Sequence, residues 1–493
     1  MNVLLIQPPA YLSKSRELGQ KQLSTNIGLA YIASYIREKG TEVSIHDATI
    51  RKFDPSVFRE IIRERRPGIV GISAFTTQIA DASYLAGLIK SIDSRITTVI
   101  GGAHASAIPE QTLEEFGAFD YAVFGEGEET FYRLILYLSG KGVFDDKGLC
   151  YRADGHIRKG SNRPLIENID SIPMPAFDLF TLAHYKPQYS HNRGLSLPIL
   201  TSRGCPYGCT FCSGPLGRRI RFHSVERIIG ELKADIAVYH PQQILVADDT
   251  FTVNKAKVID LCDRIVREGI HREVEFICET RVDLVDREIF ESMKRAGFRS
   301  VSFGIESGDA YILDKALKKI TPAQARSAVA AAKQAGLEAD GNFILGLPYD
   351  NKESIMKTIG FACSLPLDYA SFFLLVPYPG TEAARMAEND EGGLVLLSKD
   401  WTRYGKQTGG VLTLSGMSYD RLKAYQLYAY LRFYLHPRRF FNILKRVTPL
   451  TIVLFALQMV KTFFRKGPAP PSIRASNISS TNSQDRPCPP SSS

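Results

Sequence analysis

Short apolar segments alternate with helical segments through the first 135 or so residues of this 493-residue chain. Short continuous apolar strands separated by helices predict a parallel sheet that helices cover on both faces. Five strands in this order predict a doubly wound α/β domain, which binds ligands at the carboxyl ends of its strands. Those ends carry glycine and small polar residues here, so a large ligand could approach the backbone. The expected strands are NVLLIQPP (2–9), EVSIHDA (42–48), IVGISAF (69–75), TTVIGGAH (97–104) and DYAVFGEGEE (120–129).

The alternation begins again at Leu197, without a sequence repeat of the first domain. Six strand–helix units are too few for a closed eight-stranded barrel, so they predict an open partial (β/α)6 barrel with its site at the carboxyl ends of the strands. Thr321 is expected to cap one helix and Gly336 to end it. The expected strands are LPILTSR (197–203), QQILVADD (242–249), EVEFICETR (273–281), SVSFGIES (300–307), EADGNFILG (338–346) and YASFFLLVPY (369–378).

Changes in pattern and composition mark the remaining boundaries. Residues 419–464 hold apolar helices broken at Pro437 and Pro449, and the apolar run before Lys461 is about 13 residues, short of the roughly 20 that cross a bilayer. The stretch from Gly467 is rich in proline and serine, which predicts disorder. We predict a first domain at 1–138, a connector at 139–195, the partial barrel at 196–400, a carboxyl-terminal helical region at 401–466 and a disordered tail at 467–493.

The net charge of +9 is concentrated in one segment, because eight basic and no acidic residues lie between Arg432 and Lys466. A nucleic-acid enzyme would spread basic residues along its groove, so this basic and apolar mixture favours the surface of an anionic membrane. Five of the eight cysteines are scattered singly, unlike the framework of a secreted disulfide-bonded protein. The amino terminus is typical of a first strand. We therefore expect a cytoplasmic protein, with peripheral association at the inner face of the membrane as an open alternative.

Three cysteines with the spacing C-x3-C-x2-C follow the first barrel strand: Cys205, Cys209 and Cys212. A structural zinc site would require four ligands, and the nearest candidate for the fourth is His223, eleven residues further on. An iron–sulfur cluster held by three thiolates leaves one iron open to a small-molecule chelate. The spacing therefore favours a cluster over zinc.

The segment around these cysteines resembles the signature of the radical S-adenosylmethionine superfamily, in which an aromatic residue, here Phe211, precedes the last cysteine. The resemblance implies a 4Fe–4S cluster on the three cysteines, with the amino and carboxylate groups of S-adenosylmethionine on the fourth iron. Electron transfer from the cluster would then give a 5′-deoxyadenosyl radical that abstracts hydrogen from carbon.

Other barrel segments are similar to the same superfamily. GIESG (304–308) resembles the fourth-strand segment, in which Glu306 accepts ribose hydrogen bonds unless it is only a buried structural glutamate. Arg281 would pair either with the methionyl carboxylate or with Asp283. The second strand ends in ADDTF, where many members have Gly-Gly-Glu, so residues 248–250 are the candidates to contact the methionyl amino group. The implied S-adenosylmethionine-binding residues are Phe211, Asp248, Arg281, Gly304, Glu306 and Ile344.

Joined to such a barrel, the first domain resembles a flavodoxin-like cobalamin-binding domain. GGAHASAIPE (101–110) and FGEGEETF (124–131) are similar to the loops after its fourth and fifth strands. The D-x-H-x-x-G motif that supplies a histidine to cobalt in many cobalamin proteins is missing, which implies cobalamin without a protein ligand to cobalt. In the alternative, His104 only hydrogen-bonds a loop carbonyl. The implied cobalamin-binding residues are Gln7, Pro8, Asn26, Ser73, Thr76, Thr77, Gly101, Gly102, His104, Gly125, Glu126 and Gly127.

The domain order resembles cobalamin-dependent radical enzymes that include hopanoid and phosphinate methylases and the anaerobic magnesium-protoporphyrin ester cyclase. The resemblance implies a class B methyltransferase for an unactivated carbon of a hydrophobic small-molecule or lipid substrate, with ferredoxin or flavodoxin as electron donor and no nucleic-acid partner. A radical cyclase, oxidase or ring-rearranging enzyme is one alternative, and a non-catalytic cobalamin-binding sensor is another. Tyr207, Asp249 and Tyr378 are candidates to line a closed cavity between the domains, which would protect a radical from quenching.

Overall fold

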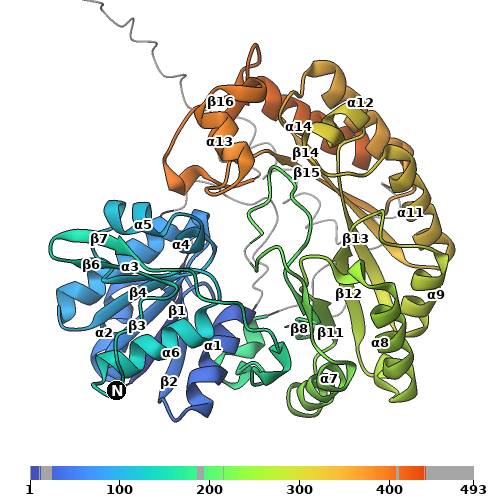
Figure 1. Ribbon diagram of the computed structural model, residues 1–493. Helices are drawn as coiled ribbons and strands as arrows, with labels where there is room; N and C mark the ends of the chain where they lie inside the picture. The colour runs from blue at the N-terminus through green and yellow to red at the C-terminus, as the bar shows by residue number, and fades with distance from the viewer. Residues whose placement is uncertain are drawn as a thin grey trace, which may run out of the picture.

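Two α/β units lie side by side, the first coloured blue to cyan and the second green to yellow, and the orange carboxyl-terminal elements lie against both (Figure 1). This computed structural model describes residues 2–9, 12, 25–185, 194–214, 216–406, 410–437 and 439.

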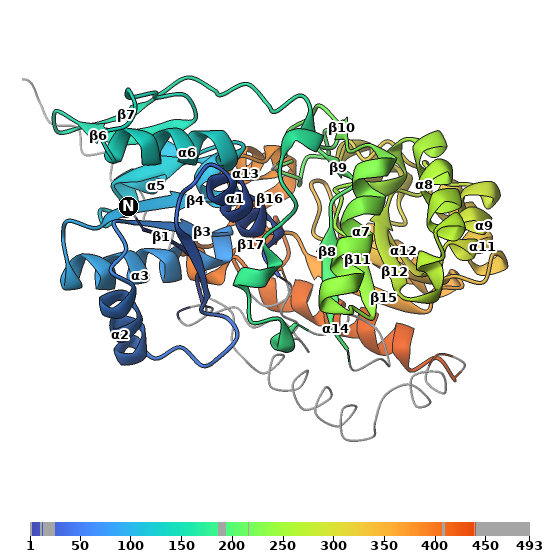
Figure 2. The same ribbon diagram turned by 90° about the horizontal axis from the view of Figure 1, so that it is seen from below.

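The first unit is built on a sheet with the strand order β2-β1-β3-β4-β5-β6-β7. Strands β1 to β5 are parallel, and their order is the flavodoxin-like order predicted from the sequence. Helices α1 and α6 pack together on one face, and α2 and α3 pack together on the other (Figure 2). The parallel strands are β1 (Val3–Gln7), β2 (Val43–Asp47), β3 (Ile69–Ser73), β4 (Thr97–Gly101) and β5 (Tyr121–Val123). The helices are α1 (Ile27–Glu38), α2 (Pro55–Arg65), α3 (Ile79–Ile92), α4 (Ala103–Ala107), α5 (Pro109–Glu115) and α6 (Gly127–Leu138).

Two further strands of this sheet come from residues that the sequence analysis placed in the connector. β6 (Leu149–Ala153) and β7 (His156–Lys159) form an antiparallel hairpin beside β5. The hairpin turns at Asp154 and Gly155, which both have a positive φ. An Asp-Gly pair between short strands is a strong hairpin signal, which the strand–helix rhythm of the preceding residues concealed.

The second unit has six parallel strands in the order β15-β14-β13-β12-β11-β8. Each strand neighbours the next along the chain with a helix between them, which confirms the open partial (β/α)6 barrel (Figure 1). The strands are β8 (Ser196–Ile199), β11 (Gln243–Val246), β12 (Glu275–Thr280), β13 (Phe298–Glu306), β14 (Glu338–Leu345) and β15 (Tyr369–Leu374). The helices are α7 (Val225–Tyr239), α8 (Lys255–Arg267), α9 (Arg287–Arg295), α10 (Ala310–Lys315), α11 (Pro322–Gln334) and α12 (Lys352–Ser364).

Helix α11 shows how the sequence sets these elements locally. The Thr321 hydroxyl accepts a hydrogen bond from the Gln324 N–H at 3.2 Å, and the Gln324 side chain accepts one from the Thr321 N–H at 2.8 Å. Pro322 occupies the first helical turn, where its missing N–H costs nothing. Gly336 follows the helix with a φ of +78°, so both predicted ends of this helix are confirmed.

The carboxyl-terminal region was expected to be helical, but part of it forms a hairpin. β16 (Leu394–Leu396) and β17 (Leu412–Leu414) pair as an antiparallel hairpin, which buries Leu412 and Leu414. Leu412 and Leu414, in the region expected to be helical, therefore belong to a strand that pairs with residues before Trp401. Helix α14 (Tyr419–Tyr434) then ends shortly before Pro437. The helices expected at 440–466 and the tail at 467–493 lie outside the described residues.

Helix α14 covers the edge of the barrel sheet. The Tyr430 hydroxyl accepts a hydrogen bond from the Phe372 N–H at 3.2 Å, and the Gln426 side-chain amide donates to the Phe372 carbonyl at 2.7 Å. The Tyr434 hydroxyl pairs with both the N–H and the carbonyl of Ala370. Side chains thus occupy backbone groups of edge strand β15 that would otherwise be open to another strand.

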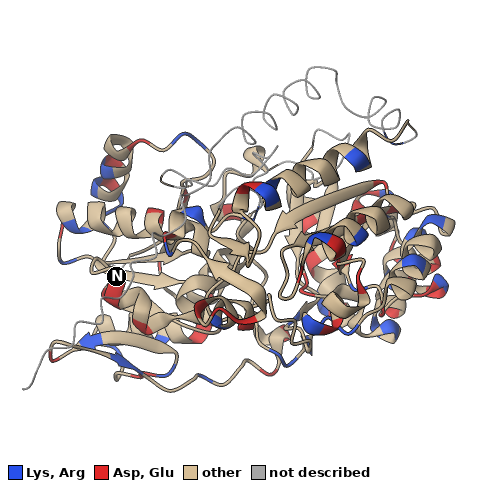
Figure 3. Cartoon of the chain, turned by 90° about the horizontal axis from the view of Figure 1, so that it is seen from above, with Lys and Arg blue, Asp and Glu red and all other residues tan. Residues whose placement is uncertain are grey.

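The two units meet at the carboxyl ends of their strands. Gly380, in the loop after β15, lies against Ala107 of α4, because a Cβ on Gly380 would be 3.1 Å from the Ala107 Cβ. The Ala176 N–H donates to the Ala30 carbonyl of α1 at 3.1 Å, and one apolar core continues through both units. Lys and Arg are interspersed with Asp and Glu on the outer helices (Figure 3).

Candidate active site

The three cysteines lie in a loop, described at residues 204–214 and 216–220, that we call the cysteine loop. Two short antiparallel strands, β9 (Ser202–Arg203) and β10 (Arg221–Phe222), close the loop at its base. Gly204 opens the loop with a φ of +95°, and a Cβ at this position would lie 2.4 Å from the carbonyl oxygen of Arg219. Only glycine allows the chain to turn this closely against its own return path.

All three cysteines are free thiols, and Cys209 is the most buried of them. Burial raises the pKa values of Cys209 and Cys212, so the thiolates need positive charge or metal to be stable. Arg281 supplies such charge, because its Nη1 lies 4.0 Å from the Cys209 Sγ. The Cys205 Sγ is 3.6 Å from the Thr250 hydroxyl.

The thiols fit a cluster better than a single ion. Among the residues that the structure describes, no three His, Cys, Asp or Glu side chains are gathered closely enough to hold one metal ion. A 4Fe–4S cluster binds each thiolate through a different iron, so its ligands do not converge on one point. His223, the candidate fourth zinc ligand, instead lies 2.8 Å through Nδ1 from Asp170.

Arg281 is held in place from three sides. Its guanidinium forms two hydrogen bonds to Asp283, of 2.9 and 3.0 Å, and lies 3.6 Å from the centre of the Tyr207 ring. Its Nη2 also donates to the carbonyl oxygen of Lys318 at 2.7 Å. The Asp283 alternative from the sequence is thus present, and the guanidinium still faces Cys209 with its other edge.

Glu306 forms a buried ion pair with Lys318, with 2.8 Å between Oε1 and Nζ. Glu306 has a φ of +66°, and the register between β13 and β14 shifts just before it. A non-glycine residue in this region is strained, which is characteristic of sites that fix a side chain. Lys318 lies between Leu317 and Lys319, which both have a positive φ as well. A Cβ on Gly304 would lie 2.7 Å from the Glu306 carboxylate, so this glycine makes room for the ion pair.

The two carboxylates that follow β11, those of Asp248 and Asp249, lie in different surroundings. Asp248 is buried and accepts four hydrogen bonds of 2.5 to 3.1 Å from the N–H groups and hydroxyls of Thr201 and Ser202. Burial raises its pKa to about 6. Its carboxylate therefore fastens the chain after β8, whereas Asp249 beside it is exposed. Ile344 lies half-buried in β14.

These contacts bring together most of the residues that the sequence assigned to S-adenosylmethionine, around one added residue. Lys318 contacts Glu306 and Arg281, and its Nζ lies 5.9 Å from the centre of the Phe211 ring. Lys318 was not predicted as a site residue, because no sequence motif marks it. The basic dipeptide after a short helix was the only signal, and it does not indicate burial.

The predicted cobalamin residues lie at the carboxyl ends of β1, β3, β4 and β5, which we call the first-domain edge. Gln7 ends β1, and its Oε1 is buried without a hydrogen-bond partner among the described residues. Gly102 has a φ of +91°, and a Cβ there would lie 2.8 Å from both the N and O of Ala74. Asn26 caps α1 through a 3.1 Å bond from the Leu29 N–H. Glycine and small polar side chains make up most of this edge, as a ligand bound largely through backbone groups would require. The remaining residues assigned to it are Pro8, Ser73, Thr77, Gly101, Gly125 and Gly127.

The His104 side chain is buried, and it contacts other residues of the protein. Its Nδ1 lies 3.2 Å from the Thr76 hydroxyl, and the ring packs edge-on at 5.0 Å against the indole of Trp401. Burial lowers the pKa of His104 to about 4, so it is neutral at physiological pH. The Trp401 indole N–H donates to Glu115 at 2.5 Å, which fastens the carboxyl-terminal region to the first domain. The contact to Thr76 replaces the loop carbonyl that the sequence suggested.

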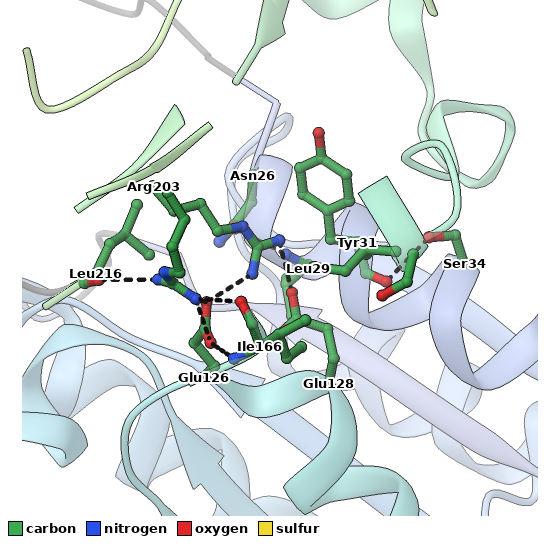
Figure 4. Close-up of polar contacts among 12 residues, drawn as sticks. Asn26, Leu29, Tyr31, Ser34, Glu126, Glu128, Ile166, Arg203 and Leu216 are labelled. Carbon is green, nitrogen blue, oxygen red and sulfur yellow. Dashed lines mark hydrogen bonds and ion pairs between the residues drawn. The ribbon is translucent and has the colours of Figure 1, made fainter. Parts of the chain in front are cut away.

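Glu126 does not face the first-domain edge as a free carboxylate. It forms ion pairs with Arg203 at 3.1 Å and Arg221 at 2.8 Å, which belong to the base of the cysteine loop (Figure 4). Of the candidate cavity residues, Tyr207 stacks on Arg281 and Tyr378 is half-buried, whereas Asp249 is exposed. Among the described residues, no helix has both the length and the apolar character needed to cross a membrane.

Two facing strand edges, one with three thiols in a loop and one lined by glycine and small polar residues, define a two-domain α/β protein of the kind that holds two large cofactors. Comparison with known proteins gives the same division. The B12 binding domain family matches residues 21–135, and the radical SAM superfamily matches residues 199–362. The chain belongs to the family of cobalamin-dependent radical S-adenosylmethionine enzymes, whose cofactors are a 4Fe–4S cluster, S-adenosylmethionine and cobalamin.

Individual relatives extend this result. An uncharacterized methyltransferase of Pyrococcus horikoshii is 38% identical over 442 residues, which cover 89% of this chain and 93% of that protein. The anaerobic magnesium-protoporphyrin IX monomethyl ester cyclase of Rubrivivax gelatinosus is 28% identical over 360 residues, 71% of this chain and 64% of that protein. The solved structure of the radical S-adenosylmethionine methyltransferase TsrM from Kitasatospora setae has the same fold, with a TM-score of 0.66 at 19% identity over 88% of this chain and 85% of that chain.

Proposed function

We propose that this protein is a methyltransferase that places a methyl group on an unactivated carbon of a small hydrophobic molecule. The observation that carries the proposal is the meeting of the two strand edges, since residues after β4 and β5 contact residues after β15 and β8. A substrate between these edges would lie next to both cofactors. The relative from Pyrococcus horikoshii, a methyltransferase in name, supports the same activity.

When bound, the cofactors supply an organic radical and a transferable methyl group. The protein supplies the thiolates of Cys205, Cys209 and Cys212 for the cluster. Arg281 and Lys318 place positive charge near the Cys209 thiol, which favours the ionised form of Cys209 and opposes the rise in its pKa that burial causes.

The charged side chains near the cysteine loop also suit the polar ends of S-adenosylmethionine. Arg281 presents planar N–H groups that match a carboxylate, and Glu306 presents acceptors that match ribose hydroxyls. The ion pair between Glu306 and Lys318 holds that carboxylate in one orientation before a ligand arrives. Both acidic and basic groups are buried, so their interactions with a ligand would be strong.

Neutral groups at the first-domain edge have a different task. His104 packs against Trp401 and is uncharged at neutral pH, so it adds no charge to the interior. Gly102 keeps the backbone after β4 close to that after β3, leaving the edge flat for a large ring system. The loop around Gly380 lies against Ala107 of α4, and such a contact at the rim would help to keep water from a radical between the units.

An anaerobic assay with S-adenosylmethionine labelled with deuterium in its methyl group tests the proposal. The protein is reconstituted with iron, sulfide and cobalamin, reduced, and analysed by mass spectrometry. Formation of both 5′-deoxyadenosine and S-adenosylhomocysteine, with the label on cobalamin, is the result expected of a methyltransferase. Formation of 5′-deoxyadenosine alone, with bound cobalamin never labelled, would overturn methyl transfer.

A radical cyclase is the second candidate, favoured by the likeness to the Rubrivivax gelatinosus cyclase over 360 residues. It predicts 5′-deoxyadenosine without methyl transfer in the same assay. Cys209→Ala should remove 5′-deoxyadenosine under either proposal, whereas the label on cobalamin separates the two.

We further propose that the substrate is lipid-like and is reached at a membrane surface, with a ferredoxin or flavodoxin as reductant. Support comes from the eight basic residues between Arg432 and Lys466. Cosedimentation of the full chain with anionic vesicles, falling at high salt, is the expected result. Equal binding to neutral vesicles, or none to either, would remove this part of the proposal. Reduction of the cluster by a purified flavodoxin or ferredoxin tests the electron donor.

A further inference from the structure

Two buried arginines face each other at the base of the cysteine loop. Arg203 of β9 and Arg221 of β10 are directly paired across the two-stranded ladder. Each side chain is only 4% exposed. Like charges directly opposite each other destabilise a strand pair, and burial makes the cost larger. The base of this loop therefore needs negative charge from elsewhere to stay closed.

That negative charge comes from the first domain. Glu126 accepts from Arg203 Nη1 at 3.1 Å and from Arg221 Nη1 at 2.8 Å, and Glu128 pairs with Arg203 Nη2 at 2.7 Å. Figure 4 shows Glu126 and Glu128 pointing from the loop after β5 and the start of α6 towards Arg203. Burial alone would lower the pKa of Arg203, but the carboxylates of Glu128 and Glu126 outweigh it and raise that pKa.

Glu126 is the central member of this group. It contacts both arginines, and its Oε2 also accepts a hydrogen bond from the N–H of Ile166 at 2.8 Å, which lies in the connector. Its neighbours Gly125 and Gly127 are two of the residues predicted to contact cobalamin. Arg203 is two residues before Cys205. The carboxylate thus joins a loop assigned to one cofactor to the loop that holds the other.

We propose that Glu126 is a positioning residue that fixes the cysteine loop relative to the first-domain edge, and so sets the separation of the cluster from cobalamin. The inference rests on the proposed function in that it takes both cofactors to be bound together. It assigns Glu126 no contact with either cofactor, in place of the cobalamin contact expected from the sequence.

The structure indicates that this tie can be removed without unfolding the chain. In Glu126→Gln, Arg203 keeps its ion pair with Glu128. Arg221 keeps hydrogen bonds to the carbonyls of Ile166 at 2.9 Å and Leu216 at 3.3 Å. The continuous apolar core between the units is untouched. The expected defect is therefore a loosened loop, not a lost domain.

Pulsed electron paramagnetic resonance on the reduced holoenzyme measures this directly, because the reduced cluster and Co(II) cobalamin are both paramagnetic. The samples are the wild-type protein, Glu126→Gln, Glu126→Asp and Glu129→Gln, each checked for iron and cobalamin content. Glu129 is the matched control, since it stands on the same helix turn but pairs at 2.6 Å with Arg133 inside the first domain.

The expected result is one narrow distance distribution between the two centres in the wild type and in Glu129→Gln. Glu126→Gln should keep both cofactors at full content but lose the single distance, and Glu126→Asp should restore it in part. An unchanged distribution in Glu126→Gln would overturn the inference. Loss of cobalamin from Glu126→Gln, with the cluster retained, would also overturn it, by making Glu126 a cobalamin contact.

If Glu126→Gln does not fold, Arg221→Gln breaks the same tie from the barrel side and should give the same broadened distribution; an unchanged distribution would again reject the inference. The outcome is separate from that of the proposed function. A wild-type protein that holds both centres at one distance but never labels cobalamin would reject methyl transfer and leave the positioning role intact.

Discussion

The two strand edges that face each other in this protein are built from different materials. The barrel edge is rich in charged side chains, because Arg281, Lys318 and Glu306 are buried around the thiol of Cys209. At the first-domain edge, glycine and small polar residues predominate. The one strongly acidic segment there, with Glu126 and Glu128, turns away to neutralise arginines of the other unit.

The difference matches what each edge has to hold. A charged cosubstrate and an anionic metal cluster call for fixed charges in a medium of low dielectric. A broad ligand with many neutral polar groups calls for accessible backbone and a flat approach. Substitutions of side chains should therefore damage the barrel edge most, and added Cβ atoms should damage the first-domain edge most.

The largest effect is expected for Cys209→Ala. Two thiolates cannot hold the cluster that three hold, so the visible absorption of the cluster and all 5′-deoxyadenosine formation should be lost. Cobalamin binding should remain within twofold or so of the wild type, because it belongs to the other edge. The control is Cys363→Ala, which removes a free thiol on α12 and should keep the cluster. Parallel loss of cobalamin from a folded Cys209→Ala protein would contradict the separation of the edges.

Gly102→Ala should produce the next largest effect, and on the first domain alone. The added Cβ would lie 2.8 Å from two backbone atoms of Ala74 at a φ of +91°. Such strain costs about 1–3 kcal/mol, so the free energy of unfolding should fall and cobalamin should bind more weakly. Thermal denaturation and cobalamin titration measure the two quantities. Gly117→Ala, whose Cβ would meet no atom within 4 Å, should change neither. A cobalamin affinity unaltered by Gly102→Ala would argue against a ligand at this edge.

Arg281→Lys should weaken S-adenosylmethionine binding about tenfold, or about 1.4 kcal/mol, while the cluster stays in place. Lysine keeps the charge but loses the paired bonds to Asp283 and the stacking on Tyr207. Equilibrium binding to the reconstituted protein measures the change. Arg287→Lys, which alters an exposed ion pair with Glu291, serves as the control. Tight binding retained by Arg281→Lys would assign Arg281 to the loop's structure only.

His104→Gln should have the smallest effect at neutral pH and a distinct one in acid. Burial holds the pKa of His104 at about 4 in the folded protein, below its ordinary value of 6.5. The unfolded chain therefore binds more protons between these values, and His104 costs stability as the pH falls from about 6.5 to 4, by at most about 3 kcal/mol. Urea unfolding at several pH values should show a shallower acid decline in His104→Gln. Identical pH profiles would mean that His104 titrates normally.

Much of the fold could be predicted from the sequence, because its strands are short, apolar and regularly separated by helices. All six barrel strands and the five parallel strands of the first sheet are confirmed, as is the cap of α11 by Thr321. The hairpins β6–β7 and β16–β17 were missed, since antiparallel strands interrupt the rhythm on which the prediction depended. The cysteine loop was evident from spacing alone.

The contacts within the site were harder to predict, because they depend on how distant segments meet. Lys318 reaches Glu306, 12 residues earlier in the chain, from a turn in which Leu317 and Lys319 both have positive φ values. Glu126 was predicted to contact cobalamin from the resemblance of FGEGEETF to a loop of cobalamin-binding domains, yet its partners lie 77 and 95 residues further along the chain. The hydrogen bonds from Thr201 and Ser202 to the Asp248 carboxylate likewise depend on the packing of two strands.

The Trp401 contact has a consequence for how the protein is made. Its indole nitrogen bonds to Glu115, 286 residues earlier in the chain. At elongation rates of 5–20 residues per second, roughly 15–60 s pass on the ribosome between the two residues. During that interval His104 has emerged without the indole that later buries it. The packing around His104 is thus completed late, only after the segment that carries Trp401 has been made.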